Sequence, residues 1–222
     1  MQAIFTQLHV EWIRYPGVGQ SIHSDLSNLE ALLSVLRVAP PGLYLDRIIE
    51  VAREELAEEC DYTLEAGHQA RFCSLLADDP DFDVPDLVQE LSTAQVLTSG
   101  WANGVPIDDD SVVALPQEER NRLALALLRL CLREVFEFQL VQTDPNWSNF
   151  LYDHSSKKLV LLDFGATRPL SKEFSASYLE LVWAAANADR DELLAKSIAL
   201  GFLTGEESQA MLCVVTAFLR AP

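Results

Sequence analysis

Three polar side chains in the second half of the sequence have the types and the spacing that could bind a metal ion and phosphate. Asp144 and Asn149 stand five positions apart, and Asp163 follows fourteen positions after Asn149, at the end of the apolar run 158–162. One carboxylate can orient or deprotonate a nucleophile, while a carboxamide oxygen and a second carboxylate can hold Mg2+ against phosphate oxygens. The chemistry that these residues suggest is therefore a magnesium–phosphate site.

The two motifs together are more specific than either motif alone. Any strand can end in Asp followed by a turn Gly, and an Asp-x-x-x-x-Asn is equally unspecific. Here both motifs occur in this order, joined by a strand–turn–strand pattern and preceded by a long apolar helix. The alternative is a polar turn at residues 144–146 and a strand-end cap at Asp163. That alternative leaves two carboxylates and Asn149 unexplained beside buried strands.

Protein kinases use the same arrangement, with an Asp and an Asn five apart in the catalytic loop and an Asp-Phe-Gly after a short hairpin. Residues 142–144, Gln-Thr-Asp, stand where typical kinases have His-Arg-Asp. The wider pattern resembles the UbiB family of atypical kinase-like ATPases (aarF-domain-containing kinases), and it is most similar to the mitochondrial coenzyme-Q-biosynthesis members. The resemblance rests on residues 142–150 (QTDPNWSNF), 162–168 (LDFGATR), 15–18 (YPGV), 59–62 (ECDY), 132–138 (LREVFEF) and 202–205 (FLTG).

This resemblance implies an α+β, mostly helical, protein-kinase-like fold with an incomplete N-terminal lobe and a helical C-terminal lobe. The partial N-lobe would be residues 1–104, and the C-lobe with the catalytic loop would be residues 105–222, together forming one kinase-like domain. The cofactors implied are Mg2+ and ATP or ADP. The partners implied are coenzyme Q biosynthesis proteins and a quinone-precursor lipid, on the matrix side of the mitochondrial inner membrane.

The resemblance also implies a role for each site residue. Asp144 would be the catalytic residue, and Asn149 and Asp163 would be the metal ligands. Glu59 would be the helix Glu that pairs with the strand lysine of the family. Glu65 follows one and a half turns later and is the second residue predicted to contact the nucleotide.

Composition limits the classes of partner. The formal net charge of −18 over 222 residues argues against nucleic acid, because a phosphate backbone needs a basic surface. No apolar run reaches the roughly 18 residues of a spanning helix, and no targeting segment is visible at the start. The cysteines lack metal-binding spacing, and the sequence predicts Cys60, Cys73 and Cys131 as small buried residues in helices.

The first residues depart from the family pattern. In the family a Val-Ala-x-Lys strand leads into Tyr-Pro-Gly, and alignment on residues 15–17 places Trp12 at the position of the lysine. Trp cannot pair with phosphates as that lysine does. Arg14 would share a strand face with Trp12 but is a poor substitute. A Gly- or Ala-rich phosphate-covering loop and a Lys-x-Gly-Gln helix are also missing, which is the pattern of a truncated chain.

Hydrophobic periodicity and turn residues predict the elements that position the site. A hairpin across His154, a turn residue, places Asn149 before one strand and Asp163 after the other, so both can face one ion. Predicted helices are residues 20–38, 46–76 (with a possible break), 116–141, 172–187, 190–200 and 205–219. Predicted strands are residues 82–85, 92–97, 150–152 and 159–162, with a hinge-like connector at residues 98–108.

The segment after Gly165 bears on the reaction. Only residues 166–172 precede the next helix, which leaves no room for a peptide-docking platform. This favours ATP hydrolysis or transfer to a small-molecule or lipid acceptor over protein phosphorylation. Two alternatives stay open. One is a non-catalytic pseudokinase scaffold, since the phosphate-binding loop and the strand lysine are missing. The other is a small-molecule phosphotransferase unrelated to quinones, which would share Asp144, Asn149 and Asp163.

Overall fold

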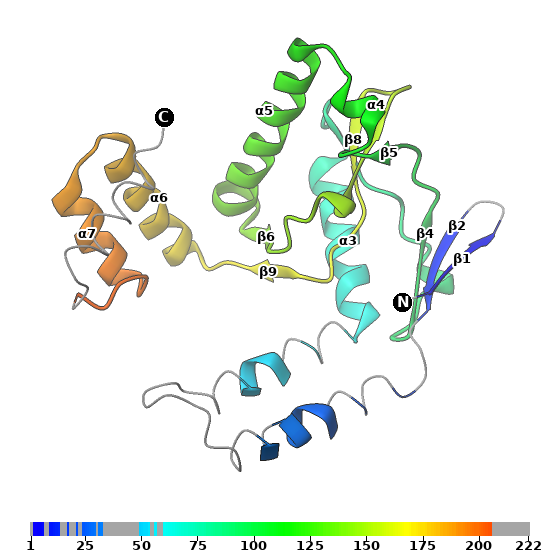
Figure 1. Cartoon of the computed structure of the whole chain (residues 1–222), viewed down its shortest axis with the longest axis horizontal. Helices are drawn as coiled ribbons and strands as arrows, with labels where there is room; N and C mark the ends of the chain where they lie inside the picture. Colours follow the sequence, from blue (N-terminus) through cyan, green and yellow to red (C-terminus); the bar gives the residue numbers. More distant parts are fainter. Residues whose placement is uncertain are drawn as a thin grey trace. The chain divides into compact units, whose positions relative to one another are not determined.

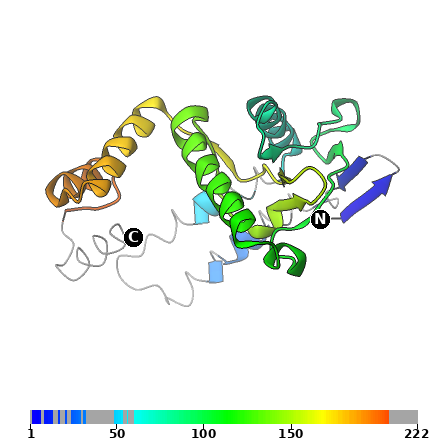
Figure 2. The same cartoon turned by 90° about the horizontal axis from the view of Figure 1, so that it is seen from above.

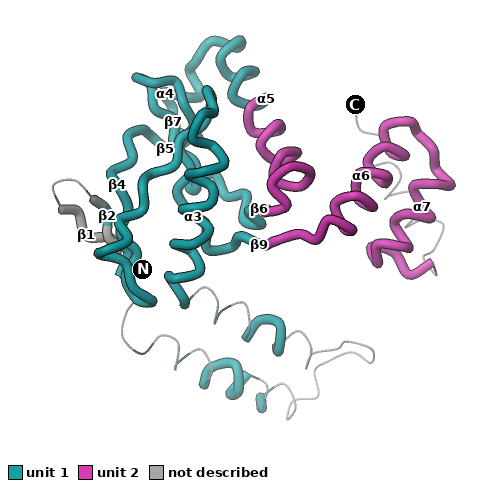
Figure 3. Tube along the Cα trace, turned by 180° about the vertical axis from the view of Figure 1, so that it is seen from behind, with its two compact units in different colours: residues 1–124, 142–167 teal, residues 125–141, 168–222 magenta. Residues whose placement is uncertain are grey.

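The computed structural model describes residues 2–6, 9–13, 17, 21, 24–29, 31–32, 49–53, 56 and 60–205 (Figure 1). The chain forms two compact units (Figure 3). Unit 1 comprises residues 1–124 and 142–167, and unit 2 comprises residues 125–141 and 168–222. The helix-rich α+β architecture agrees with the prediction. The predicted lobe boundary at residue 104 remains a prediction.

The first sheet of unit 1 is antiparallel, in the order β1 (Gln2–Thr6), β2 (His9–Ile13) and β4 (Val96–Gly100). Trp12 on β2 stands opposite Leu97 on β4. Helix α3 (Tyr62–Leu76) contributes the buried side chains of Tyr62 and Ala66, which form a cluster with Leu97, and Trp12 packs against this cluster. This packing joins α3 to the two strands.

Helix α3 begins at a clear N-cap. The Asp61 side chain accepts a hydrogen bond from the backbone N–H of Thr63 at 2.9 Å, which satisfies one of the free donors of the first turn. Residues 49–53 are helical and residue 60 lies in a turn, so the helix predicted over 46–76 is interrupted before Asp61. In the predicted helix 20–38, the described residues 21, 24–29 and 31–32 are helical.

The second sheet of unit 1 carries the site hairpin. Its order is β3 (Phe82–Asp83), β8 (Lys158–Leu161), β7 (Phe150–Asp153) and β5 (Val105–Pro106). Strands β7 and β8 pair antiparallel with Phe150 opposite Leu161. Their inward residues, including Tyr152, Leu159 and Leu161, are buried. The predicted hairpin is therefore confirmed: β7 alternates buried and partly exposed residues, whereas Leu159, Val160 and Leu161 of β8 are all buried.

The strand predicted at 92–97 begins later than expected. Residues Gln89–Leu91 form a 3-10 turn (η1), and Thr93 and Val96 exchange backbone hydrogen bonds that close a tight turn. The strand β4 starts only at Val96 and continues through Gly100, into the predicted connector. Local hydrogen bonding by Thr93, whose hydroxyl also accepts from the N–H of Val96, competes here with extended pairing.

The long helix before the catalytic loop ends earlier than predicted. After α4 (Asp110–Val113), α5 runs over Gln117–Arg133 and is followed by a π-helical turn, η2 (Glu134–Phe138). Gln139 then takes a left-handed conformation, with φ of 52°, which ends the helix. Leu140 and Val141, predicted as the end of the helix, instead belong to β6 (Leu140–Gln142), which pairs with β9 (Thr167–Pro169).

Unit 2 contains a helical pair, as predicted. Helices α6 (Lys172–Ala186) and α7 (Arg190–Ala199) pack through Leu181, Ala184 and Leu193 (Figure 2). The helix predicted at 205–219 lies outside the described residues. Cys131 is exposed, so its predicted burial is wrong, whereas Cys60 is buried. Within the described residues, no helix combines the length and the apolar character that crossing a bilayer requires.

Candidate active site

Asp144 and Asn149 contact each other directly. The Asn149 carboxamide N–H groups donate to the backbone carbonyl and to the Oδ2 of Asp144, both at 3.2 Å. Asn149 ends the 3-10 turn η3 (Trp147–Asn149), whose N-cap Asn146 accepts from the N–H of Ser148. Asn149 is buried, with 7% of its surface exposed, whereas Asp144 is exposed. Among the described residues, the Asn149 Oδ1 accepts a hydrogen bond only from the Ser148 hydroxyl, at 3.4 Å, so this oxygen is a potential metal ligand.

The β7–β8 hairpin attaches Asp163 beside Asn149. The backbone N–H of Leu162 donates to the carbonyl of Asn149 at 3.0 Å, so the residue before Asp163 is bonded to the residue before β7. The Gln142 side-chain amide donates to the carbonyl oxygen of Asp163. One carboxylate oxygen of Asp163, Oδ1, accepts from the N–H of Gly165 at 2.9 Å. The predicted metal residues are thus held on neighbouring backbone segments.

Glu65 on α3 lies against the same segment. A Cβ added to Gly165 would lie 3.4 Å from the Oδ1 of Asp163 and 3.6 Å from the Oε2 of Glu65, so both carboxylates border this glycine. Burial and, second, the charge of Asp163 raise the pKa of Glu65 to about 7, and a hydrogen bond from the backbone of Phe164 opposes the shift. A carboxyl group whose pKa is raised by burial and by a neighbouring carboxylate favours a bound cation.

Glu65 is one of the two glutamates predicted to contact the nucleotide, and it lies beside Asp163. Glu59 itself lies outside the described residues. Glu65 and Phe72 both lie on α3, seven positions apart, so they share one helix face. The Phe72 and Phe164 rings lie 5.1 Å apart between centroids, so this face meets residues 163–165.

Trp12, the residue that the sequence aligns with the family's lysine, is partly buried on β2. Trp12 on β2 packs against the cluster that contains Ala66, the residue after Glu65. Burial, Asp163 and Phe164 are the causes that shift the pKa of Glu65, and no cation in the described part of the chain is among them. Arg14, the possible substitute, lies outside the described residues.

The oxygen donors near Asp163 suit an Mg2+ ion that is also held by phosphates and water, rather than a metal ion held by protein side chains alone. Among the described residues, no three His, Cys, Asp or Glu side chains gather as a complete metal site. Mg2+ usually keeps several waters and is held by one or two carboxylates together with substrate phosphates. A carboxamide oxygen of Asn149 and the Asp163 carboxylate, with Glu65 adjacent, fit that pattern.

Two residues before Asp144 support the site but were not predicted to do so. Gln142 holds the carbonyl of Asp163, as described above. Thr143 donates both its backbone N–H, at 3.1 Å, and its hydroxyl, at 2.6 Å, to the carbonyl of Ala166. The sequence showed that these two residues replace the His-Arg of typical kinases. It could not show their hydrogen bonds to backbone carbonyls, because such bonds do not depend on the residue type of the acceptor.

Comparison with known proteins identifies the family of the chain. Residues 12–197 match the model of the ABC1 atypical kinase-like domain. The chain belongs to this family, the UbiB group of atypical kinases. The ABC1 match spans both units and includes Trp12, Glu65, Asp144, Asn149 and Asp163.

Several curated relatives share this domain. The chain is 52% identical over 198 residues to "Atypical kinase COQ8B, mitochondrial" of Rattus norvegicus, covering 89% of this chain and 37% of that protein. It is 45% identical over 202 residues to "Atypical kinase COQ8, mitochondrial" of Saccharomyces cerevisiae, covering 90% and 39%. The chain therefore spans about two-fifths of the length of these relatives.

A solved structure has the same fold. The Rv3197–erythromycin complex from Mycobacterium tuberculosis is similar with a TM-score of 0.69 and 26% identity, covering 85% of this chain and 47% of that one. Together with the family match, this similarity shows that the ABC1 chain has a kinase-like fold, as its sequence predicted.

Proposed function

We propose that this chain is an atypical kinase-like ATPase that binds Mg2+ with ATP or ADP and supports coenzyme Q biosynthesis in mitochondria. Its reaction is ATP hydrolysis or phosphoryl transfer to a small-molecule or lipid acceptor. The observation that carries the proposal is the hydrogen bond between Leu162 and Asn149. It fixes Asn149 next to Asp163, while Asn149 also holds Asp144.

Each site residue has a separate task in this proposal. A bound Mg2+ would supply neutralisation of the charge that develops on the phosphates. Asn149, through Oδ1, and Asp163 hold the metal. Asp144 keeps one oxygen on Asn149, and its exposed carboxylate can orient or deprotonate an attacking hydroxyl or water. Most of the rate enhancement then comes from positioning and charge stabilisation.

Nucleotide binding with little or no turnover is a second candidate, close to the pseudokinase alternative. Trp12 favours it, because an apolar ring packs near Ala66 where a kinase places a lysine. Without that ammonium group the α- and β-phosphates lose a charge-assisted hydrogen bond. The expected penalty is roughly ten- to a hundred-fold in affinity.

The physiological setting is inferred from the relatives. The names of the rat and yeast relatives call them mitochondrial COQ8-type atypical kinases. These names support a mitochondrial setting. We further propose that the chain acts on the matrix side of the inner membrane, with coenzyme Q biosynthesis proteins, on a quinone-precursor lipid. The short segment between Gly165 and α6 fits a small acceptor better than a peptide.

Calorimetric titration of ADP into the chain, with and without Mg2+, tests the proposed function. We expect saturable binding that requires Mg2+ and that weakens about ten-fold or more in Asp163→Asn, because a carboxylate ligand is lost. Asp108→Asn removes an exposed acid and is the matched control. Binding that ignores both Mg2+ and Asp163→Asn would refute the assignment of the metal site.

A further inference from the structure

Arg122 on α5 joins three separate segments of unit 1. Its guanidinium donates to Glu119 one turn earlier, at 2.8 and 3.2 Å. It also donates to the Asp81 carboxylate, at 2.5 Å, and to the backbone carbonyl of Lys157, at 2.6 Å. Arg122 thereby ties the beginning of α5 to the segment before β3 and to the turn between β7 and β8.

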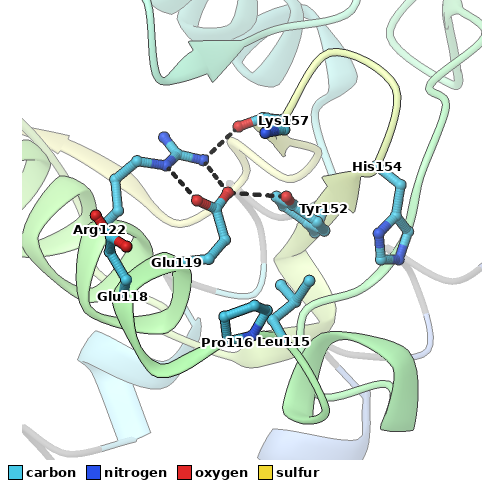
Figure 4. A pocket seen from close by; sticks show the side chains of 8 residues that line it. All are labelled: Leu115, Pro116, Glu118, Glu119, Arg122, Tyr152, His154 and Lys157. Atoms are coloured by element: carbon cyan, nitrogen blue, oxygen red, sulfur yellow. Dashed lines mark hydrogen bonds and ion pairs between the residues drawn. The ribbon is translucent and has the colours of Figure 1, made fainter.

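Glu119 extends this network to the centre of the hairpin. The Tyr152 hydroxyl donates to the Oε1 of Glu119 at 2.9 Å, and the Tyr152 side chain is almost completely buried. Tyr152 lies three residues after Asn149 on β7. Figure 4 shows Arg122, Glu119, Tyr152 and Lys157 on one wall of an open cavity of about 480 Å3.

The network contacts the β7–β8 hairpin at Lys157 and at Tyr152. Neither residue is among those proposed to bind the nucleotide or the metal. Lys157 is in the hairpin turn, with a left-handed φ of 59°, a conformation that costs free energy for a residue with a side chain. The hydrogen bond from Arg122 to its carbonyl holds this turn. The hydrogen bond from the Tyr152 hydroxyl to Glu119 attaches the strand β7 to α5. Since Asn149 precedes β7 and Asp163 follows β8, the spacing of the two metal residues depends on how the hairpin sits.

We propose that Arg122 and Glu119 are positioning residues for the Mg·nucleotide site: by clamping Tyr152 and the Lys157 turn to α5, they hold Asn149 and Asp163 at metal-binding spacing. This inference rests on the proposed function. It adds residues that lie outside both kinase motifs. A bidentate guanidinium–carboxylate pair suits this task because its two parallel bonds fix orientation as well as distance.

The test uses the full chain with Arg122→Gln, Tyr152→Phe and the control Arg120→Gln. Arg120 is an exposed arginine on the same helix that contacts only Gln117 among the hydrogen bonds described, so it matches the charge loss. Tyr152→Phe removes one hydroxyl and keeps the buried ring, which protects the experiment if Arg122→Gln does not fold. Two quantities are measured: hydrogen exchange of the Leu162 amide, and the Mg2+ concentration that half-saturates ADP binding.

We expect Leu162 to exchange about ten-fold faster or more in Arg122→Gln and Tyr152→Phe, and the Mg2+ midpoint to rise by a similar factor, since about 1.4 kcal/mol corresponds to ten-fold. The Leu193 amide in α7 should not change, because it bonds to Asp189 in unit 2. A variant that only lowered stability would leave the Mg2+ midpoint of the folded protein unchanged.

Two results separate the hypotheses. Leu162 exchange and a Mg2+ midpoint equal to those of Arg120→Gln would overturn the positioning role. If the unmodified chain binds no Mg·ADP, the proposed function fails. In that case the exchange of Leu162 still decides whether this network holds the hairpin ends together.

Discussion

At the scale of single residues, the molecule places two acidic side chains close together, and one of them is largely buried. Glu65 and Asp163 both border Gly165, and burial together with the Asp163 charge raises the pKa of Glu65 to about 7. In the metal-free protein, native Glu65 therefore keeps a proton that the unfolded chain releases. A carboxyl group that shifts in this direction makes the protein less stable as pH rises.

This shift predicts a specific pH dependence for Glu65→Gln. Between pH 4.5, the ordinary pKa, and about 7, the native protein binds more protons than the unfolded chain, so its stability falls with rising pH. The loss is at most about 1.4 kcal/mol per pH unit, and less because Glu65 is partly exposed. Urea unfolding with a chelator present should show this slope in the unmodified chain and a flatter one in Glu65→Gln. Equal slopes in the two proteins would contradict the burial of a carboxylate at this place.

At the scale of elements, α3 and the Asp-Phe-Gly segment are joined by one aromatic contact. Phe72 has no exposed surface, and its ring meets that of Phe164, which is also buried. Phe72 shares a helix face with Glu65, and Phe164 directly follows Asp163. The contact between the two rings therefore helps to fix the position of Glu65 relative to Asp163. Removing it should therefore affect binding as well as stability.

Phe72→Ala tests this link. Loss of a fully buried Phe costs about 3–5 kcal/mol of unfolding free energy, and the remaining folded protein should bind Mg·ADP more weakly. Phe72→Leu keeps most of the volume and should have a clearly smaller effect on both quantities. Denaturant unfolding and calorimetry measure them. Full Mg·ADP affinity in folded Phe72→Ala would show that α3 does not position the site.

Predictability differed between elements for physical reasons. The β7–β8 hairpin was predictable because two short apolar runs flank the polar turn at residues 153–156. The end of α5 was not, because Leu140 and Val141 continue an apolar pattern, and only the left-handed Gln139 breaks the helix. Among the site residues, Asp144, Asn149 and Asp163 follow from motif spacing. Glu65 was predicted from the family resemblance, whereas the Arg122 network depends on contacts between distant segments, which leave no pattern in the sequence.

At the scale of the whole molecule, nucleotide binding and turnover depend on the residue at the position where the family has its strand lysine. The chain carries the residues that we assign to the metal but has Trp12 at the lysine position, so we predict weak nucleotide binding and slow turnover or none. Trp12→Lys should strengthen Mg·ADP binding by about ten-fold, because a charge-assisted hydrogen bond is worth roughly 1.5–3 kcal/mol. Trp12→Met, which also loses the ring, is the control, and calorimetry is the measurement. No gain of Trp12→Lys over Trp12→Met would rule out this strand position as the missing phosphate contact.

The most direct test of the central claim is a double-mutant cycle on Mg·ADP affinity with Asn149→Ala, Asp163→Asn and the double variant, measured by calorimetry. If both side chains hold one metal ion, each single change should weaken binding about ten-fold or more, and the double variant should be little worse than either, because the second loss acts on a site already broken. Strictly additive effects, or single variants that bind as tightly as the unmodified chain, would show that Asn149 and Asp163 do not share a metal.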